Sequence, residues 1–129
     1  MRISVDEARG FFAHKSQRVL GMDPDDMHDD GIEYWASGPI CVAFHRSFWP
    51  GVWMAHYGVK PEGWGQLVDP ALTILSEFWD EVQPVRITGW TEEKNRQAVS
   101  FSRRLGFVED GRMDLPTGTI IMQGWTKCH

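Results

Sequence analysis

The sequence has few cysteines, no surplus of basic residues and no long apolar run, and each shortage excludes a class of protein. The two cysteines, Cys41 and Cys128, stand far apart and in no metal-ligand spacing, so we expect reduced thiols and no metal site. The formal net charge of -5 argues against a basic face that holds nucleic acid. No stretch approaches the roughly 18 apolar residues of a membrane helix, and the first residues resemble no signal peptide. We therefore expect a cytoplasmic protein with neither a membrane nor a nucleic-acid partner.

Aromatic residues, in contrast, are abundant, with seven Trp and seven Phe among 129 residues. Each such ring buries a large apolar area, so the core is expected to depend on them. Hydrophobic residues make up 42% of the chain, which is enough for a core, and we see no linker, repeat or low-complexity segment. The sequence therefore predicts one domain over residues 1–129.

The first half of the chain predicts a helix, an acidic loop and three strands. Apolar residues recur at helical spacing over 5–20, which predicts a helix there. The segment 23–30 is rich in aspartate but lacks the ligand order of a calcium loop, so it is interpreted as a solvated loop. Strands are predicted over 32–37, 40–48 and 52–59. Short turns with Gly and Pro separate these strands, which predicts an antiparallel meander.

The second half predicts alternating helices and strands. Asp69 is interpreted as the N-cap of a helix with Pro70 in its first position, and Pro84 ends that helix. A short strand follows over 85–90. The remaining predicted elements are a helix over 95–105 and two closing strands over 107–113 and 119–126. This order predicts an α/β fold: a three-strand meander, a βαβ crossover and closing strands in one mixed sheet, with helices on both faces.

One stretch carries a motif of a known kind. Residues 95–111 open on Asn95, carry a small residue three positions later and an apolar residue six positions later, and continue through Gly106 and Phe107 to an acidic residue followed by Gly. This stretch resembles the C-terminal motif of the GCN5-related N-acetyltransferases, the GNAT family. The segment 118–122 is similar to the last strand of that family. The element order matches as well, and the short chain resembles small phage-encoded members.

The resemblance implies a fold, a cofactor and a reaction. GNAT proteins bind acetyl-CoA where two parallel strands splay apart, which in this chain would be near Val59 and Trp90. The pantetheine amides would then bond to open strand backbone around Val59, as an added strand does. The reaction implied is transfer of an acetyl group to a primary amine of a small molecule or of a protein. In the family, a glycine-rich loop that opens the next helix holds the pyrophosphate on its backbone N–H groups.

The phosphate loop of the family follows the pattern Arg or Gln, any two residues, Gly, any residue, then Gly or Ala. The preferred alignment has no gap and places Trp64, Leu67 and Asp69 at the three defined positions, so only Gly65 is a family-like glycine. A carboxylate at Asp69 would repel a phosphate by about 4 kcal/mol at ~4 Å and an effective dielectric of 20, before screening. The N-cap interpretation of Asp69 competes with this one, because an amide bonded to its own cap is not available to a ligand.

A second alignment places the loop earlier in the chain. Residues 60–65 fit the pattern with Lys60 first and with Gly63 and Gly65 as the glycines, at the expense of a longer segment before the helix. Taken together, the two alignments give Gly63, Trp64 and Gly65 as candidate cofactor-binding residues. Nearby cations that could compensate for the altered loop, or that simply form a solvated helix face, are Lys60, Lys94, Arg96, Arg103 and Arg104.

The candidate catalytic residues follow from what acetyl transfer requires. The amine must lose a proton, and His56 is the first candidate base because it lies on the strand beside the expected thioester and titrates near neutral pH. Tyr57 faces the opposite side of that strand, and Glu33 is the third candidate. Ser102 occupies the position where many GNAT proteins carry a Tyr that protonates the leaving thiolate. Asn95 is the best-supported site residue, although it also fits the cap of its helix.

Two hypotheses follow. The first is an N-acetyltransferase that uses acetyl-CoA. The second is a binding or assembly protein, for example of a phage particle, which keeps the fold without the chemistry. The altered phosphate loop, the serine at 102 and the many tryptophans favour the second hypothesis, and the match of motif and element order favours the first.

Overall fold

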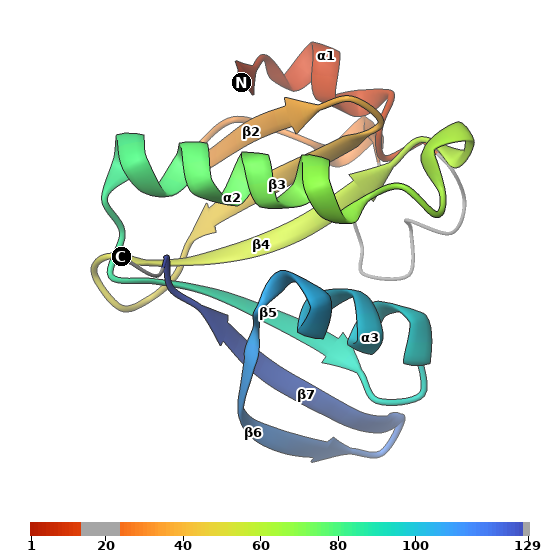
Figure 1. The fold of residues 1–129 in the computed structure, drawn as a ribbon. Coiled ribbons are helices and arrows are strands. Elements are labelled where there is room, and N and C mark those ends of the chain that lie inside the picture. Colours follow the sequence, from red (N-terminus) through yellow and green to blue (C-terminus); the bar gives the residue numbers. More distant parts are fainter. Residues whose placement is uncertain (14–23, 128–129) are drawn as a thin grey trace.

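The computed structural model describes residues 1–13 and 24–127 of the chain. Within these residues, the strands form one sheet in the order β1-β2-β3-β4-β5-β7-β6. Helices α2 and α3 lie on one face of this sheet and α1 on the other (Figure 1). The mixed α/β fold with helices on both faces is therefore confirmed. No helix among the described residues has the length and apolarity needed to cross a membrane.

The elements follow the predicted order, with one short strand added at the start. The strands are β1 (Arg2–Ile3), β2 (Ile32–Ser37), β3 (Ile40–Arg46), β4 (Val52–Val59), β5 (Arg86–Glu92), β6 (Val108–Leu115) and β7 (Gly118–Trp125). The helices are α1 (Val5–Arg9), α2 (Val68–Val82) and α3 (Arg96–Leu105), with short 3-10 turns η2 (Pro24–Asp26) and η3 (Pro61–Gly63). Strands β2, β3 and β4 pair antiparallel, so the predicted meander is confirmed.

The first helix is much shorter than the sequence predicted. Ser4 and Glu7 form a capping box that starts α1, and the helix ends at Arg9. The prediction of a helix over 5–20 is therefore wrong after Arg9 within the described residues, and its part from residue 14 onward lies outside them. Phe12 leaves the helix to bury its ring against Gly58 of β4, where a Cβ would stand 2.8 Å from that ring. Phe12 is apolar because its ring is buried, and its position in the sequence also fits a helical spacing, which is why a longer helix was predicted.

Helix α2 begins two residues earlier than predicted and without a side-chain cap. Its first residue is Val68, and the N-cap is Leu67, which makes no side-chain cap bond. The prediction that Asp69 caps this helix is therefore wrong. Asp69 stands inside the first turn instead, where its charge complements the helix dipole.

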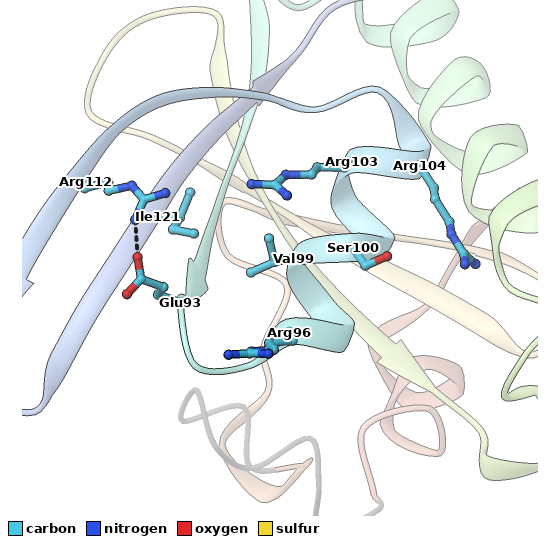
Figure 2. A pocket seen from close by; sticks show the side chains of 8 residues that line it. All are labelled: Glu93, Arg96, Val99, Ser100, Arg103, Arg104, Arg112 and Ile121. Atoms are coloured by element: carbon cyan, nitrogen blue, oxygen red, sulfur yellow. Dashed lines mark hydrogen bonds and ion pairs between the residues drawn. The ribbon is translucent and has the colours of Figure 1, made fainter.

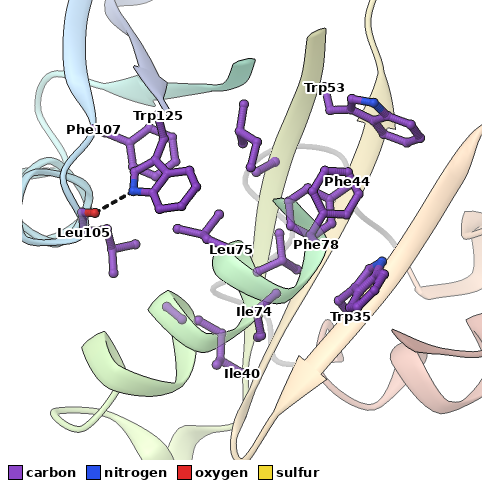
Figure 3. Packing of buried hydrophobic residues seen from close by; sticks show 14 of the residues in the cluster. Trp35, Ile40, Phe44, Trp53, Ile74, Leu75, Phe78, Leu105, Phe107 and Trp125 are labelled. Carbon is purple, nitrogen blue, oxygen red and sulfur yellow. Dashed lines mark hydrogen bonds between the residues drawn. The ribbon is translucent and has the colours of Figure 1, made fainter. Parts of the chain in front are cut away.

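The main core lies between α2 and the sheet and is built from aromatic rings (Figure 3). Phe78 of α2 stacks on Phe44 of β3 with ring centroids 3.7 Å apart. Trp35 and Trp53 contact the same Phe78 ring edge-on, at 5.9 and 5.2 Å. Ring contacts of this kind contribute beyond the area that they bury. The expectation that the core depends on aromatic residues is confirmed.

A smaller core lies on the opposite face of the sheet, under α1. It contains Cys41 and Ala43 of β3 together with Tyr34 and Phe12. Burial raises the pKa of the Cys41 thiol to about 12, so this cysteine is an unreactive thiol and forms no disulfide. Cys128 lies outside the described residues.

The last three strands do not follow chain order. Strand β7 pairs antiparallel with both β5 and β6, so it lies between them. Helix α3 connects β5 to β6 across the same face as α2 and ends at Gly106, whose φ of 98° requires glycine. The indole N–H of Trp125, at the end of β7, donates to the carbonyl of Leu105 at 2.7 Å, which ties that helix end to the sheet.

Candidate functional site

Strands β4 and β5 are parallel neighbours that separate after three residue pairs. Val52–Met54 pair with Arg86–Thr88, and no further pairing joins the two strands. Beyond this point β4 pairs only with β3, and β5 pairs only with β7. Figure 1 shows the two strands diverging between α2 and α3. The predicted splay between the strands that end near Val59 and Trp90 is confirmed.

The splayed part of β4 carries main-chain groups that face the gap. At the end of β4, the N–H of Lys60 bonds to the carbonyl of Pro39 at 2.9 Å, so even-numbered residues direct their main-chain groups toward β3. Hydrogen-bonding direction alternates along a strand, so the odd-numbered Tyr57 and Val59 direct theirs toward β5. Since β5 has turned away there, these groups form an open strand edge that an extended ligand can pair with.

His56 lies on the α1 side of the sheet, beside His45 of the neighbouring strand. The two imidazole rings are 5.0 Å apart and nearly perpendicular. Burial lowers the pKa of His56 to about 4, and His45 adds to this effect. Burial also lowers the pKa of His45, whose Nε2 is buried with no hydrogen-bond partner. Both rings are therefore neutral at neutral pH and present a lone pair.

A cavity of about 570 Å³ opens on the same side of the sheet as His56. It spans the paired ends of β4 and β5 and reaches the first splayed residues. Its lining residues are His45, Arg46, Ser47, Phe48, Trp49, Val52, Met54, His56, Arg86, Thr88, Trp90 and Asp110. Sequence analysis missed His45 as a neighbour of His56. The length of the turn between β3 and β4 fixes the strand register, which pairs His45 with Met54. From this register the sequence could have placed His45 next to His56.

Tyr57 lies on the opposite face, toward α2 and α3, as alternation along the strand predicted. Its ring meets Phe101 of α3 edge-on at 5.5 Å. Its hydroxyl oxygen is buried without a hydrogen-bond partner, and burial raises the pKa of this phenol. The two rings occupy space between β4 and α3, next to the open strand edge.

Glu33 does not reach the splay. It lies on β2, and its register partner Phe44 stands between it and β4. The Glu33 carboxylate accepts a hydrogen bond from the Trp35 indole at 3.2 Å and lies 3.7 Å from Arg2. Partners in register share a face, and Phe44 belongs to the core under α2, so Glu33 and His56 face opposite sides of the sheet.

The residues of the predicted phosphate loop have other structural roles in the turn after β4. Gly63 is buried against Pro39, so closely that a Cβ would lie 2.2 Å from the proline ring. Gly65 has a φ of 96°, which favours glycine. Trp64, between them, is exposed. Only the ungapped alignment leads directly into α2, because residues 60–65 end three positions before Val68.

The first turn of α2 offers few amides to an anion. Pro70 has no N–H, and the N–H of Ala71 already bonds to the carbonyl of Leu67 at 3.0 Å. This leaves the amides of Val68 and Asp69, beside the Asp69 carboxylate. The first turn of α2 is therefore a poor site for the pyrophosphate end of a CoA molecule.

Of the candidate site residues on and beside α3, Asn95 and Ser102 have structural roles, whereas Arg103 is exposed. The Asn95 side chain caps the helix by accepting a hydrogen bond from the N–H of Ala98 at 3.2 Å. Ser102 is buried within the packed face of the helix. Arg103 points over β7 into a second cavity, away from the gap between β4 and β5 (Figure 2).

The other cations that were considered as compensation for the loop do not gather at the start of α2. Lys60 stacks over the Phe11 ring, with Nζ 4.4 Å from its centroid, and Lys94 pairs with Glu92. Among residues 1–13 and 24–127, no group of histidine, cysteine and carboxylate side chains could hold a metal ion.

The sequence matches no protein-family model and none of the curated proteins. Solved structures with a similar fold exist. A GNAT-family acetyltransferase from Bacillus anthracis matches with a TM-score of 0.60 and 14% identity, over 67% of this chain and 57% of that protein. A ribosomal-protein-S5-alanine acetyltransferase from Vibrio fischeri matches with a TM-score of 0.72 and 12% identity, over 97% of this chain and 90% of the other.

A third similar structure is spermidine N-acetyltransferase from Vibrio cholerae in complex with CoA and spermine. It matches with a TM-score of 0.65 and 14% identity, over 76% of this chain and 67% of that protein. These likenesses establish that the chain has the fold of the GNAT acetyltransferases.

Proposed function

We propose that this protein is an N-acetyltransferase that uses acetyl-CoA and acts on a primary amine. The observation that carries the proposal is the splay of β4 and β5, which leaves the main-chain groups of Tyr57 and Val59 without strand partners. The fold neighbours support it, because each of those proteins is itself described as an acetyltransferase.

The open edge of β4 would hold the pantetheine arm by strand-like hydrogen bonds to Tyr57 and Val59. When bound, acetyl-CoA supplies the acyl group, and the CoA thiolate is the leaving group. Because a thiol has a pKa of about 8.5, this thiolate can leave near neutral pH without a protein acid to protonate it. The buried Ser102 is therefore compatible with transfer. The Asp69 carboxylate weakens the hold on the phosphates, so we expect a modest affinity for the cofactor.

The amine would approach from the α1 side of the sheet, through the cavity that contains His56. This cavity meets the gap where β4 and β5 begin to part, so an amine within it faces the start of the open edge. The neutral imidazole of His56 can accept a hydrogen bond from the amine and orient its lone pair toward the gap.

A second candidate function is a binding or assembly protein, for example in a phage particle, that does not transfer acyl groups. Three observations favour it. Pro70 and Asp69 impair the anion site at α2, and the rings of Tyr57 and Phe101 occupy space beside the open strand edge. In addition, Phe48 and Trp49 are exposed at the β3–β4 turn, as aromatic residues of protein interfaces are.

Calorimetric titration with acetyl-CoA separates the two functions, followed by an assay of thiol release with a panel of primary amines. The first proposal predicts saturable binding and amine-dependent release of thiol. His56→Gln should lower the turnover by about 100-fold and leave cofactor binding intact. His28→Gln, which makes the same change at an exposed site, is the control. Absence of binding at millimolar acetyl-CoA would exclude the acetyltransferase and favour the second function.

A further inference from the structure

Trp90 of β5 lies across the start of the splay from His56 of β4. The last residue pair that joins these two parallel strands is Met54 with Thr88. His56 and Trp90 each follow two positions later, so they lie on the same face of the sheet as that pair and on opposite sides of the gap. Both line the cavity that contains His56, which we name the amine cavity. An amine that donates a hydrogen bond to His56 therefore has an indole ring on the opposite wall.

The rest of the amine cavity offers apolar surface, because most of its polar side chains already have partners. The apolar residues that extend its wall toward the β3–β4 turn are Phe48, Trp49, Val52 and Met54. The Thr88 hydroxyl donates to the carbonyl of Gln123 at 3.0 Å. The Ser47 hydroxyl bonds to the main chain of Trp49. Apart from its amine, a ligand in this cavity therefore gains most from apolar and ring contacts.

The charges around the amine cavity suit a ligand with a single positive charge. Asp110 is the only carboxylate among the described residues that line it, and Arg86 binds that carboxylate at 2.7 Å. Arg86 reaches it across β7, where Gly124 has no side chain to block the guanidinium. Arg46 adds a further positive charge. One ammonium group can bind the lone pair of the neutral His56 beside aromatic rings, whereas a second would find no unpaired carboxylate among these lining residues.

We propose that the acceptor is a monoamine that carries an aromatic ring, with its nitrogen at His56 and its ring against Trp90 and Met54. The proposal rests on the proposed function, because it names the acceptor class for the same site. The apolar wall favours the ring, and the paired state of Asp110 disfavours a polyamine. In the transfer, the nitrogen of the neutral amine forms an amide bond to the acetyl carbon and the thioester C–S bond breaks. CoA leaves as a thiolate, and the nitrogen loses one proton to water.

Steady-state kinetics with 2-phenylethylamine, spermidine and n-propylamine test the proposal on the full chain. We expect kcat/KM for 2-phenylethylamine to exceed that for spermidine at least about tenfold. Trp90→Leu should lower the ratio of kcat/KM for 2-phenylethylamine to that for n-propylamine about tenfold, because only the first amine has a ring to contact. A general loss of folding or of cofactor binding would lower both activities alike and leave this ratio unchanged.

Trp64→Leu is the matched control, because it makes the same change at an exposed tryptophan that does not line the amine cavity. It should leave the ratio within about twofold of the parent value. Thermal melting verifies that both variants are folded.

Calorimetric titration with 2-phenylethylamine, without acetyl-CoA, separates this proposal from the acetyltransferase. Saturable binding that Trp90→Leu weakens about tenfold, without acetyl transfer to any amine, would keep the aromatic amine as the ligand and exclude only the enzyme. Transfer that prefers spermidine, or a ratio that Trp90→Leu leaves unchanged, would overturn the proposal while the acetyltransferase stands. The absence of both binding and transfer would exclude both.

Discussion

The hydroxyl groups of two tyrosines differ in their hydrogen bonding, and removal of each single oxygen atom measures the difference. The hydroxyl of Tyr57 is buried without a partner, whereas that of Tyr34 donates to the carbonyl of His28 at 2.6 Å. A buried polar group without a hydrogen bond destabilises the folded state by about 1–3 kcal/mol. Tyr57→Phe is therefore expected to raise the free energy of unfolding by about 1 kcal/mol, as measured by urea denaturation without ligand.

Tyr34→Phe is the matched control, because it removes the same atom from a tyrosine whose hydroxyl has a hydrogen-bond partner. It should lower the free energy of unfolding by about 1 kcal/mol, since it breaks the bond to His28. Equal losses in both variants would show that the Tyr57 hydroxyl has a partner in solution.

The two neighbouring histidines make stability depend on pH. Burial lowers the pKa of His56 from 6.5 to about 4, so the unfolded chain takes up this proton before the folded chain does. The free energy of unfolding should therefore be highest above pH 6.5 and fall as the pH drops toward 4, by about 3 kcal/mol for His56. His45, whose pKa burial also lowers, acts in the same direction.

Urea denaturation at several pH values between 4 and 7 measures this dependence. His56→Gln should flatten the decline, because glutamine does not titrate. A variant that declines as steeply as the parent would place the acid sensitivity elsewhere in the chain.

Single residues were predictable where their role is local. Asn95 as a helix cap and Gly106 as a helix end follow from sequence, because each acts on the backbone beside it, and both are confirmed. Asp69 was wrongly predicted as the N-cap because α2 starts at Val68. Leu67 and Val68 pack against the core, and this packing sets the start of the helix. Whether Glu33 lies near His56 depends on the register between β2 and β3, which could not be derived from the sequence.

The first turn of α2 is the element that most limits cofactor binding. Within it, Asp69 adds a negative charge where the ungapped alignment expects Gly or Ala. Asp69→Gly is therefore expected to tighten acetyl-CoA binding by about tenfold in a calorimetric titration, because it removes a repulsion close to the phosphates.

Glu81→Gln provides the control at the other end of the same helix. It removes one negative charge from an exposed position at the C-terminal end of α2, so the affinity should change little. An equal gain in both variants would assign the effect to net charge and not to the site.

Elements were predictable where their periodicity is long and regular. Helices α2 and α3 and the meander of β2, β3 and β4 lie close to their predicted places. The first helix was overextended because Phe11 and Phe12 keep a helical spacing while packing from a turn. The sequence predicted β6 and β7 as a closing pair. Their order in the sheet depends on which of them pairs with β5, and that pairing joins residues far apart in the sequence, such as Ile87 and Trp125.

At the scale of the whole molecule, one sheet separates two chemical environments. The α2 and α3 face carries the aromatic core and the open edge of β4, and the α1 face carries the paired histidines and their cavity. The GNAT fold and the splay were predictable from a motif and an element order, whereas the cavities were not, because side chains from several separate segments form each of them.

The central claim is that the splayed edge of β4 binds acetyl-CoA. Amide hydrogen exchange with and without acetyl-CoA measures this edge directly, peptide by peptide. The account predicts slower exchange at Tyr57 and Val59 when acetyl-CoA is present, because the pantetheine arm would engage their main-chain groups. Unchanged exchange at residues 57–59 under saturating acetyl-CoA would contradict the claim.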